Sequence, residues 1–272
     1  MASDKIRKAV IPAAGLGTRF YPLTRAQPKE MLPVLDKPII HYVVEEAVNS
    51  GLDQILIVVG SGKDSIINYF DSNKMDEKFD GHGFDSLPDI YFVRQKSLNG
   101  LGDSIRYAEK FVDGDPFVVL LGDTIYRSSI DITVTSQLIN SFQRWKRPVI
   151  AVEKVPREKI SDYGIISGKE LEPGVWSIES LVEKPRPEEA PSNIGITGTY
   201  ILDDQIFSSI RELKPGRNGE YQLTDALSIL SLKQEIIGSE FKGRRYDIGT
   251  KELWIKAFME FVKQDERFKG LA

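Results

Sequence analysis

The chain contains no cysteine, and its 272 residues include only two histidines, His41 and His82. Without cysteine it can form neither disulfides nor thiolate-ligated metal centres, and no cysteine is available as a nucleophile. Two histidines supply too few imidazoles for a typical histidine-based zinc site. These absences exclude disulfide-stapled proteins and argue against zinc enzymes.

Long hydrophobic runs and an excess of positive charge are also missing. No run approaches the roughly 18 apolar residues of a membrane span, and the first residues lack the apolar core of a signal peptide, so we expect a cytoplasmic protein without membrane contact. The formal net charge is −4, which disfavours non-specific nucleic-acid binding because that needs a basic face. An anionic substrate must therefore be held by local cations.

Apolar runs and helical patterns alternate along the chain. The segments expected as strands are Lys8–Ala13, Gln54–Val59, 90–94, 117–121 and 149–155. Helical spacing of apolar residues indicates a helix from Pro38, in its first turn, to just before Gly51, and further helices over 65–70 and 103–112. Strand–helix–strand alternation predicts an α/β, Rossmann-like fold with a mostly parallel sheet that is covered on both faces.

The stretch 154–202 breaks this alternation. Its β-like pieces, 163–167, Val175–Glu183 and Ile194–Leu202, are separated by Pro/Gly turns (185–192 is one) and predict a small β-rich lobe with a mixed sheet. Helices over 223–232 and 251–263 follow, and the polar stretch 71–87 is expected to be a mobile loop. We expect one domain over 1–272, with functional parts at about 1–150, 151–250 and 251–272.

A glycine-rich turn follows the first strand. The run Ala14-Gly-Leu-Gly-Thr-Arg-Phe20 leads on to Pro28-Lys-Glu-Met-Leu-Pro33. Glycine allows positive φ and lets an anion approach backbone N–H groups, while Arg19 and Lys29 offset its charge. Such a turn at the carboxyl end of a parallel strand predicts a polyphosphate site. Its expected residues are Ala13, Ala14, Gly15, Gly17, Arg19 and Lys29.

Two further strand ends carry side chains suited to a nucleotide and its metal. The amide of Gln95 offers a donor and an acceptor side by side, which match the imide edge of uracil or thymine, and Gly100 is placed to bring main-chain groups to the same base. Asp123 ends an apolar strand, and Asp247 also ends one, before a glycine. Because Mg²⁺ prefers one or two carboxylates with phosphate oxygens and water, we expect Mg²⁺ at Asp123 and, directly or through water, at Asp247.

Taken together, these motifs resemble the signature of the sugar-1-phosphate nucleotidyltransferases, nearest to the bacterial and archaeal UTP–glucose-1-phosphate uridylyltransferase branch. The resemblance runs from Lys8 to about Phe261. It implies that Gln95 and Gly100 bind the base, and that the β-rich lobe binds the sugar. It also implies a homo-oligomer, dimeric or tetrameric. Many uridylyltransferases of bacteria have histidine at the position of Asp103, so the role of Asp103 stays open.

On the sugar side, the resemblance assigns Glu183 to sugar hydroxyls and Lys184 to the sugar phosphate. These neighbours on one strand face the same way only if the strand bends there, and Pro185 favours such a bend. Gly164, Gly198 and Glu220 are implied as further sugar-side residues, whereas Thr224 and Asp225 are expected to cap the next helix.

The implied reaction is Mg²⁺-dependent transfer of UMP from UTP to glucose-1-phosphate, with Arg19, Lys29, Asp123 and Lys184 as the catalytic residues. No general base is required, because the sugar phosphate is already ionised at neutral pH. One alternative is a thymidylyltransferase or an enzyme that uses both UTP and dTTP. Uracil and thymine differ by one methyl group, which contributes only about 1–3 kcal/mol to discrimination between them. A second alternative is a non-catalytic sugar-nucleotide-binding regulatory subunit. Retention of the catalytic set together with Asp247 argues against it.

Overall fold

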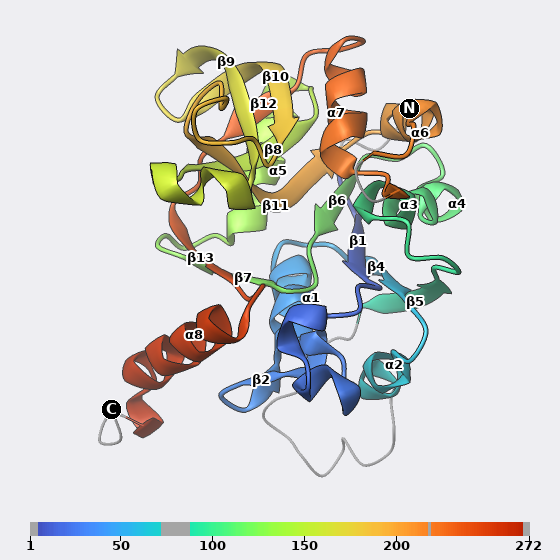
Figure 1. The fold of residues 1–272 in the computed structure, drawn as a ribbon, viewed down its shortest axis with the longest axis vertical. Coiled ribbons are helices and arrows are strands. Elements are labelled where there is room, and N and C mark those ends of the chain that lie inside the picture. Colours follow the sequence, from blue (N-terminus) through green and yellow to red (C-terminus); the bar gives the residue numbers. More distant parts are fainter. Residues whose placement is uncertain (1–4, 72–87, 217–218, 269–272) are drawn as a thin grey trace.

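The computed structural model describes residues 5–71, 88–216 and 219–268, and the loop expected over 71–87 lies outside them except for Asp71. A nine-stranded mixed sheet crosses the molecule in the order β5-β4-β1-β6-β11-β8-β12-β10-β9 (Figure 1). Its strands are β1 (Lys8–Ala13), β4 (Gln54–Val59), β5 (Asp89–Arg94), β6 (Phe117–Leu120), β8 (Val149–Lys154), β9 (Gly164–Glu172), β10 (Val175–Glu183), β11 (Ile194–Leu202) and β12 (Ile237–Ser239). The predicted α/β class, with a mixed sheet flanked by helices, is confirmed.

The two halves of the sheet differ in direction. Strands β5, β4, β1 and β6 are parallel, as the alternation of strands and helices predicts. Beyond them β11 pairs antiparallel with both β6 and β8, and β9 pairs with β10 and also with β11. The last five strands therefore curl back on themselves. The β-rich lobe is this curled half, and its strands continue the central sheet.

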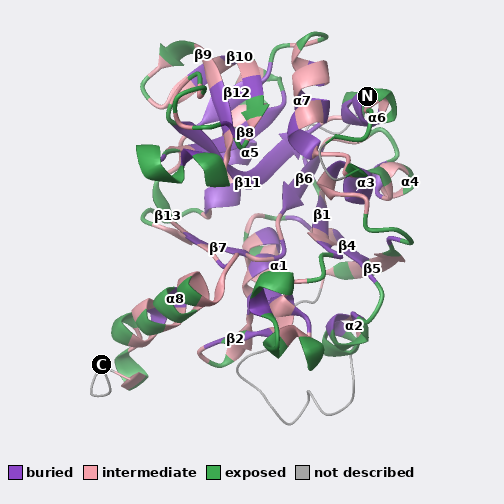
Figure 2. Cartoon of the chain, in the orientation of Figure 1, coloured by how far each residue is buried: buried purple, intermediate pink, exposed green. Residues whose placement is uncertain are grey.

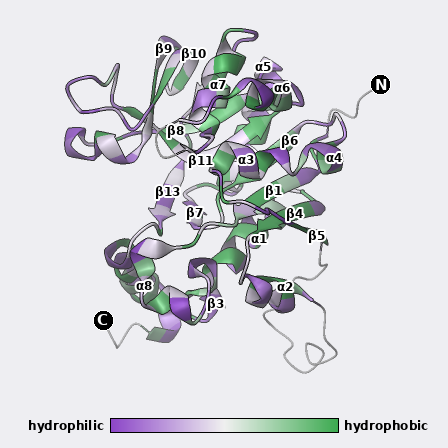
Figure 3. Ribbon diagram, turned by 45° about the vertical axis from the view of Figure 1, so that its right-hand side comes forward, coloured by the Kyte–Doolittle hydropathy of each residue, from purple (hydrophilic) through white to green (hydrophobic). Residues whose placement is uncertain are grey.

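Helices cover both faces because strand side chains alternate. On β1, Val10 faces one core while Ala9 and Ile11 face the other. The first core is covered by α3 (Leu101–Arg106), α4 (Glu109–Val112), α6 (Gln205–Glu212) and α7 (Leu223–Ser231). The second is covered by α1 (Ile39–Asn49), α2 (Asp64–Phe70) and α5 (Val134–Trp145). The central strands are accordingly buried and hydrophobic (Figures 2 and 3).

A third, smaller core lies outside the main sheet. The two-stranded ribbon of β7 (Thr124–Ser128) and β13 (Gly243–Asp247) packs with the hairpin of β2 (Pro33–Val34) and β3 (Lys37–Pro38) and with α8 (Lys251–Gln264). Phe261 of α8 is buried in this core, and the indole of Trp254 donates a hydrogen bond to the Pro33 carbonyl. Of the two predicted metal carboxylates, Asp247 is the last residue of β13 and Asp123 directly precedes β7.

The remaining elements are short 3₁₀ turns: η1 (Thr18–Phe20), η2 (Leu23–Arg25), η3 (Lys29–Met31), η5 (Arg157–Asp162) and η7 (Glu266–Phe268). No helix among the described residues is long and apolar enough to cross a bilayer.

Several sequence-based expectations need correction. The helix expected over 103–112 begins earlier, at Leu101, and divides into α3 and α4. It starts there because Gly100, with φ of 99°, turns the chain into it. Pro38 is the residue before α1 and not part of its first turn. The helices α5 and α6 were not predicted from the sequence, although Thr133 caps α5 by accepting a hydrogen bond from the Ser136 N–H.

Candidate functional site

Two adjoining cavities open at the carboxyl ends of the parallel strands, where ligands of open α/β sheets bind. The loop cavity, of about 510 Å³, is lined by the glycine-rich turn after β1 and by Gln95 and Gly100 after β5. The lobe cavity, of about 450 Å³, is lined by the turn after β10 and by β11. Lys29, Asp123 and Glu220 line both, so the two cavities form one continuous site.

The structure brings most of the predicted site residues to these walls. The loop cavity contacts Ala14, Gly15, Gly17, Lys29, Gln95, Gly100, Asp123 and Glu220. The lobe cavity contacts Gly17, Arg19, Lys29, Asp123, Gly164, Glu183, Lys184, Gly198, Glu220 and Asp247. Ala13 lines neither cavity: its side chain is 1% exposed and packs in the core on the α1 side of the sheet.

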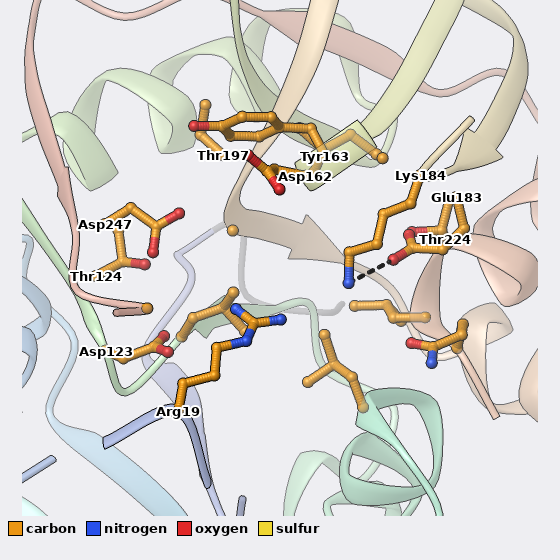
Figure 4. A pocket seen from close by; sticks show the side chains of 18 of the residues that line it. Arg19, Asp123, Thr124, Asp162, Tyr163, Glu183, Lys184, Thr197, Thr224 and Asp247 are labelled. Atoms are coloured by element: carbon orange, nitrogen blue, oxygen red, sulfur yellow. Dashed lines mark hydrogen bonds and ion pairs between the residues drawn. The ribbon is translucent and has the colours of Figure 1, made fainter. Parts of the chain in front are cut away.

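Cations and carboxylates meet at the centre of the site. Figure 4 shows Asp123 and Asp247 on one side of the lobe cavity, Glu183 and Lys184 on the other, and Arg19 between them. Lys29 makes a short ion pair with Asp123. Burial alone would lower the pKa of the Lys29 ammonium, but Asp123 and the other nearby carboxylates outweigh it, and the pKa is raised. Lys29 therefore stays cationic, as an anion-binding group must.

The β7–β13 ribbon sets the spacing of the two predicted metal ligands. Asp247 lies opposite Thr124 in the ladder, and the N–H of Ile248 donates a 2.9 Å hydrogen bond to the carbonyl of Asp123. Two carboxylates at the edge of a phosphate site fit the donor set that Mg²⁺ prefers, with phosphate and water completing its shell. The described residues hold no cluster of three or more histidine and acidic ligands.

Glu183 and Lys184 face the same cavity because the chain bends between them. Lys184 directly follows β10 and adopts a left-handed backbone conformation with φ of 45°, and its N–H donates to the Tyr163 carbonyl. Its Nζ lies 3.4 Å from Glu183 Oε1, so both side chains point into the lobe cavity. A non-glycine residue in this region stores about 1–3 kcal/mol of strain, and such strain gathers at functional sites.

Thr224 belongs to this wall and does not cap a helix. The residue before α7 is Gln222, and no side chain caps the helix start. The Thr224 hydroxyl instead donates a 2.6 Å hydrogen bond to Glu183 Oε2 and so orients that carboxylate. Asp225 lies in the first turn of α7, where a negative charge is favoured by the helix dipole. A Cβ at Gly164 would meet Thr224 Oγ1 at 3.2 Å and Glu183 Oε2 at 3.3 Å, so a larger residue here would press on the hydroxyl and the carboxylate of this wall.

Two ion-pair networks at the cavity walls have no local sequence signal. Arg245 bonds Glu153 at 2.7 Å, Asp247 at 3.0 Å and the hydroxyl of Tyr163 at 2.7 Å, which ties the ribbon to the lobe. Glu30 and Lys63 form a nearly fully buried pair at 2.7 Å. The Arg245–Glu153 and Glu30–Lys63 pairs join residues far apart in sequence, and only the tertiary fold brings them together.

The chemistry of the walls divides the site. Backbone N–H groups, Arg19 and Lys29 at the glycine-rich turn suit a polyphosphate, and the apolar side chains of Leu98 and Leu101 suit a flat ring beside it. The lobe cavity offers a carboxylate and a lysine, which suit hydroxyls and a phosphate. Such a site can hold two phosphorylated substrates next to each other, and transfer between them is the reaction it is suited to promote.

The chain belongs to the nucleotidyl transferase family, whose model matches residues 8–264. A Streptococcus pyogenes protein named UTP–glucose-1-phosphate uridylyltransferase 2 is 42% identical over 97% of this chain and 93% of its own length. A Methanocaldococcus jannaschii protein, provisionally named UTP–glucose-1-phosphate uridylyltransferase, is 48% identical over 94% of this chain and 93% of its own length.

Solved structures agree with this family. A UDP-glucose pyrophosphorylase complexed with UDP-glucose superposes with a TM-score of 0.90 at 41% identity, covering 96% of this chain and 100% of that one. The UTP-bound enzyme of Acinetobacter baumannii has a TM-score of 0.86 at 33% identity, over 97% of this chain and 96% of that one. The resemblance drawn from the sequence motifs is thereby confirmed.

Proposed function

We propose that this chain transfers UMP from UTP to glucose-1-phosphate and releases pyrophosphate. The observation that carries the proposal is the single continuous site, in which Asp123 and Asp247 lie on one side, Glu183 and Lys184 on the other, and Arg19 of the triphosphate-type turn between them. The names of the relatives support the same activity. A regulatory subunit would need no such arrangement of cations and carboxylates around the position of phosphate transfer.

In this reaction an oxygen of the sugar phosphate attacks the α-phosphorus of UTP, and pyrophosphate leaves on the opposite side. Positioning and neutralisation of charge supply the catalysis. Lys184 would hold the attacking phosphate, and Thr224 would keep Glu183 turned toward the sugar hydroxyls. Arg19 and Lys29 would stabilise the negative charge that develops on the triphosphate.

Asp123 and Asp247 would hold Mg²⁺, which neutralises phosphate charge when bound. Each carboxylate is paired with a cation, Lys29 for Asp123 and Arg245 for Asp247, so neither lies unbalanced beside the phosphates. We expect each pair to loosen when metal and nucleotide bind, because the metal and the cationic side chain then compete for the same carboxylate.

The test is pyrophosphate release measured with four nucleoside triphosphates, UTP, dTTP, CTP and ATP, each combined with several sugar-1-phosphates. We expect the highest kcat/KM for UTP with glucose-1-phosphate, loss of activity with EDTA and recovery with Mg²⁺. No turnover of UTP with glucose-1-phosphate would overturn the proposal, and recovery only with other divalent ions would overturn the choice of Mg²⁺.

A thymidylyltransferase or an enzyme of dual use is the second candidate. The carbonyl oxygen of Gln95 can accept from the N3–H of thymine as well as from that of uracil, and the same assay separates them through the ratio of kcat/KM for UTP and dTTP. The homo-oligomer implied by the family stays a prediction, which sedimentation at several protein concentrations would test.

A further inference from the structure

Asp103 has no role in the reaction above, yet it is buried beside the proposed base site. Its side chain is 3% exposed and Gln95 is 4% exposed. Gln95 Nε2 donates a 2.8 Å hydrogen bond to Asp103 Oδ2 and a longer one, 3.4 Å, to the Gly100 carbonyl. Gln95 lines the loop cavity and Asp103 does not. The NH₂ group of Gln95 is therefore turned from the cavity toward Asp103.

The chemistry of the partner fixes this orientation. An ionised carboxylate only accepts hydrogen bonds, so the face of the amide toward Asp103 must be its NH₂ and not its oxygen. Arg106 holds Asp103 from the other side, donating from Nη2 at 2.6 Å and from Nε at 3.1 Å to Oδ1. A guanidinium only donates, so Asp103 Oδ1 serves as its acceptor and Oδ2 is left to accept from Gln95.

Two acceptor-capable groups are left without partners on the cavity side. No donor among the described residues reaches Gln95 Oε1. The hydroxyl of Ser104, next to Asp103 on α3, is also buried at the cavity wall without a hydrogen-bond partner in the described part of the chain. A ligand that supplies a donor to Gln95 Oε1 would satisfy this arrangement.

We propose that Asp103, held by Arg106, is a specificity-determining positioning residue: it locks the Gln95 amide so that only the carbonyl oxygen is presented to the base. The site then selects bases whose ring nitrogen N3 carries a hydrogen, uracil and thymine, and rejects cytosine, whose N3 is an acceptor. This inference rests on the proposed function, because it takes the loop cavity as the base site.

The substitution Asp103→Asn directly tests whether Asp103 sets the orientation of the Gln95 amide. Because Arg106 only donates, the introduced amide must turn its oxygen toward Arg106 and its NH₂ toward Gln95. Gln95 must then turn its own oxygen toward that NH₂ and its own NH₂ toward the cavity, where it suits the acceptor N3 of cytosine. The variant is isosteric, and Glu109→Gln, which breaks the exposed Glu109–Arg211 pair on the neighbouring α4, serves as control.

The measurement is equilibrium binding of UTP and CTP, each with Mg²⁺, by calorimetry. We expect the wild type and Glu109→Gln to favour UTP on the order of 10²-fold or more, and Asp103→Asn to reduce this ratio at least tenfold with a melting temperature that shows a folded protein. An unchanged ratio in folded Asp103→Asn would overturn the inference.

A second arm needs no variant. UTP methylated at N3 cannot donate to Gln95 Oε1, so the wild type should bind it as poorly as CTP, and binding equal to that of UTP would also overturn the inference. The two proposals remain separable. If the wild type binds no nucleotide, both the proposed function and the role of Asp103 are wrong. If the wild type prefers UTP but Asp103→Asn has the same ratio of UTP to CTP affinity, only the role of Asp103 is wrong.

Discussion

Lys184 combines an unusual backbone conformation with an exposed functional group. Its φ of 45° turns the chain after β10, and its ammonium reaches the lobe cavity beside Glu183. The side chain is half exposed, so it contributes little to stability through packing or through its pair with Glu183. The backbone geometry at this residue and the function of its side chain can therefore be separated by mutation.

We predict that Lys184→Ala and Lys184→Gly both lower kcat/KM on the order of 10²–10³-fold, because each removes the cation that holds the attacking phosphate. Glycine accepts positive φ without strain, which offsets its larger chain entropy in the unfolded state, so Lys184→Gly should keep its free energy of unfolding within about 1 kcal/mol of wild type. Steady-state kinetics and urea denaturation measure the two effects.

Lys169→Ala, which removes an exposed lysine from β9, is the matched control and should leave both quantities unchanged. Near-normal activity in the two Lys184 variants would show that Lys184 does not bind the attacking phosphate.

At the scale of elements, the site depends on turns that pack against each other behind the cavity wall. The turn after β4 lies against the glycine-rich turn after β1, since a Cβ at Gly60 would meet the Ala14 carbonyl at 2.6 Å. Lys63, from the same turn, bonds Glu30 of η3. This pair ties the start of α2 to the turn that carries Lys29.

Replacing only one residue of the Glu30–Lys63 pair should destabilise the protein much more than replacing both. Glu30→Gln or Lys63→Met alone leaves one buried charge uncompensated, for which we expect a loss of about 3–5 kcal/mol. The double variant removes both charges and should recover most of that loss. Chemical denaturation of the four proteins checks this, and additive effects of the two substitutions would contradict it.

The same elements show what sequence patterns can predict. Apolar runs such as Gln54–Val59 are long, continuous and bounded by turns, and they form the expected strands. The motif residues that follow such strands reach one continuous site because parallel strands end at the same edge. The helix α5 has a local signal in the sequence, because Thr133 is a residue type that favours the N-cap position.

Other features depend on contacts between distant segments. The sequence predicts a β-rich lobe within the same domain but not how it joins the sheet, and the pairing of β11 with β6 makes the lobe a continuation of the central sheet. Thr224 resembles a helix cap in the sequence, yet its hydroxyl bonds Glu183, 41 residues away. Local patterns predict which elements form, whereas the partners of polar side chains follow from the packing of those elements.

At the scale of the whole molecule, the proposed product would span both halves of the sheet. The loop cavity is built on the parallel half and the lobe cavity on the curled half. We predict that UMP slows amide hydrogen exchange only around residues 13–20 and 95–103, and that UDP-glucose also slows it around 162–164 and 183–184. Protection confined to the first two segments with both ligands would contradict a sugar site in the lobe.

The ribbon of β7 and β13 has a consequence for the synthesis of the protein. Its ladder places Asp247 against the segment that begins at Asp123, although β13 is among the last strands of the chain. A growing chain that has already folded its parallel strands still holds only one of the two carboxylates. The second joins it only after β13 has left the ribosome and paired, so the acidic pair is completed later than the synthesis of all strands of the main sheet.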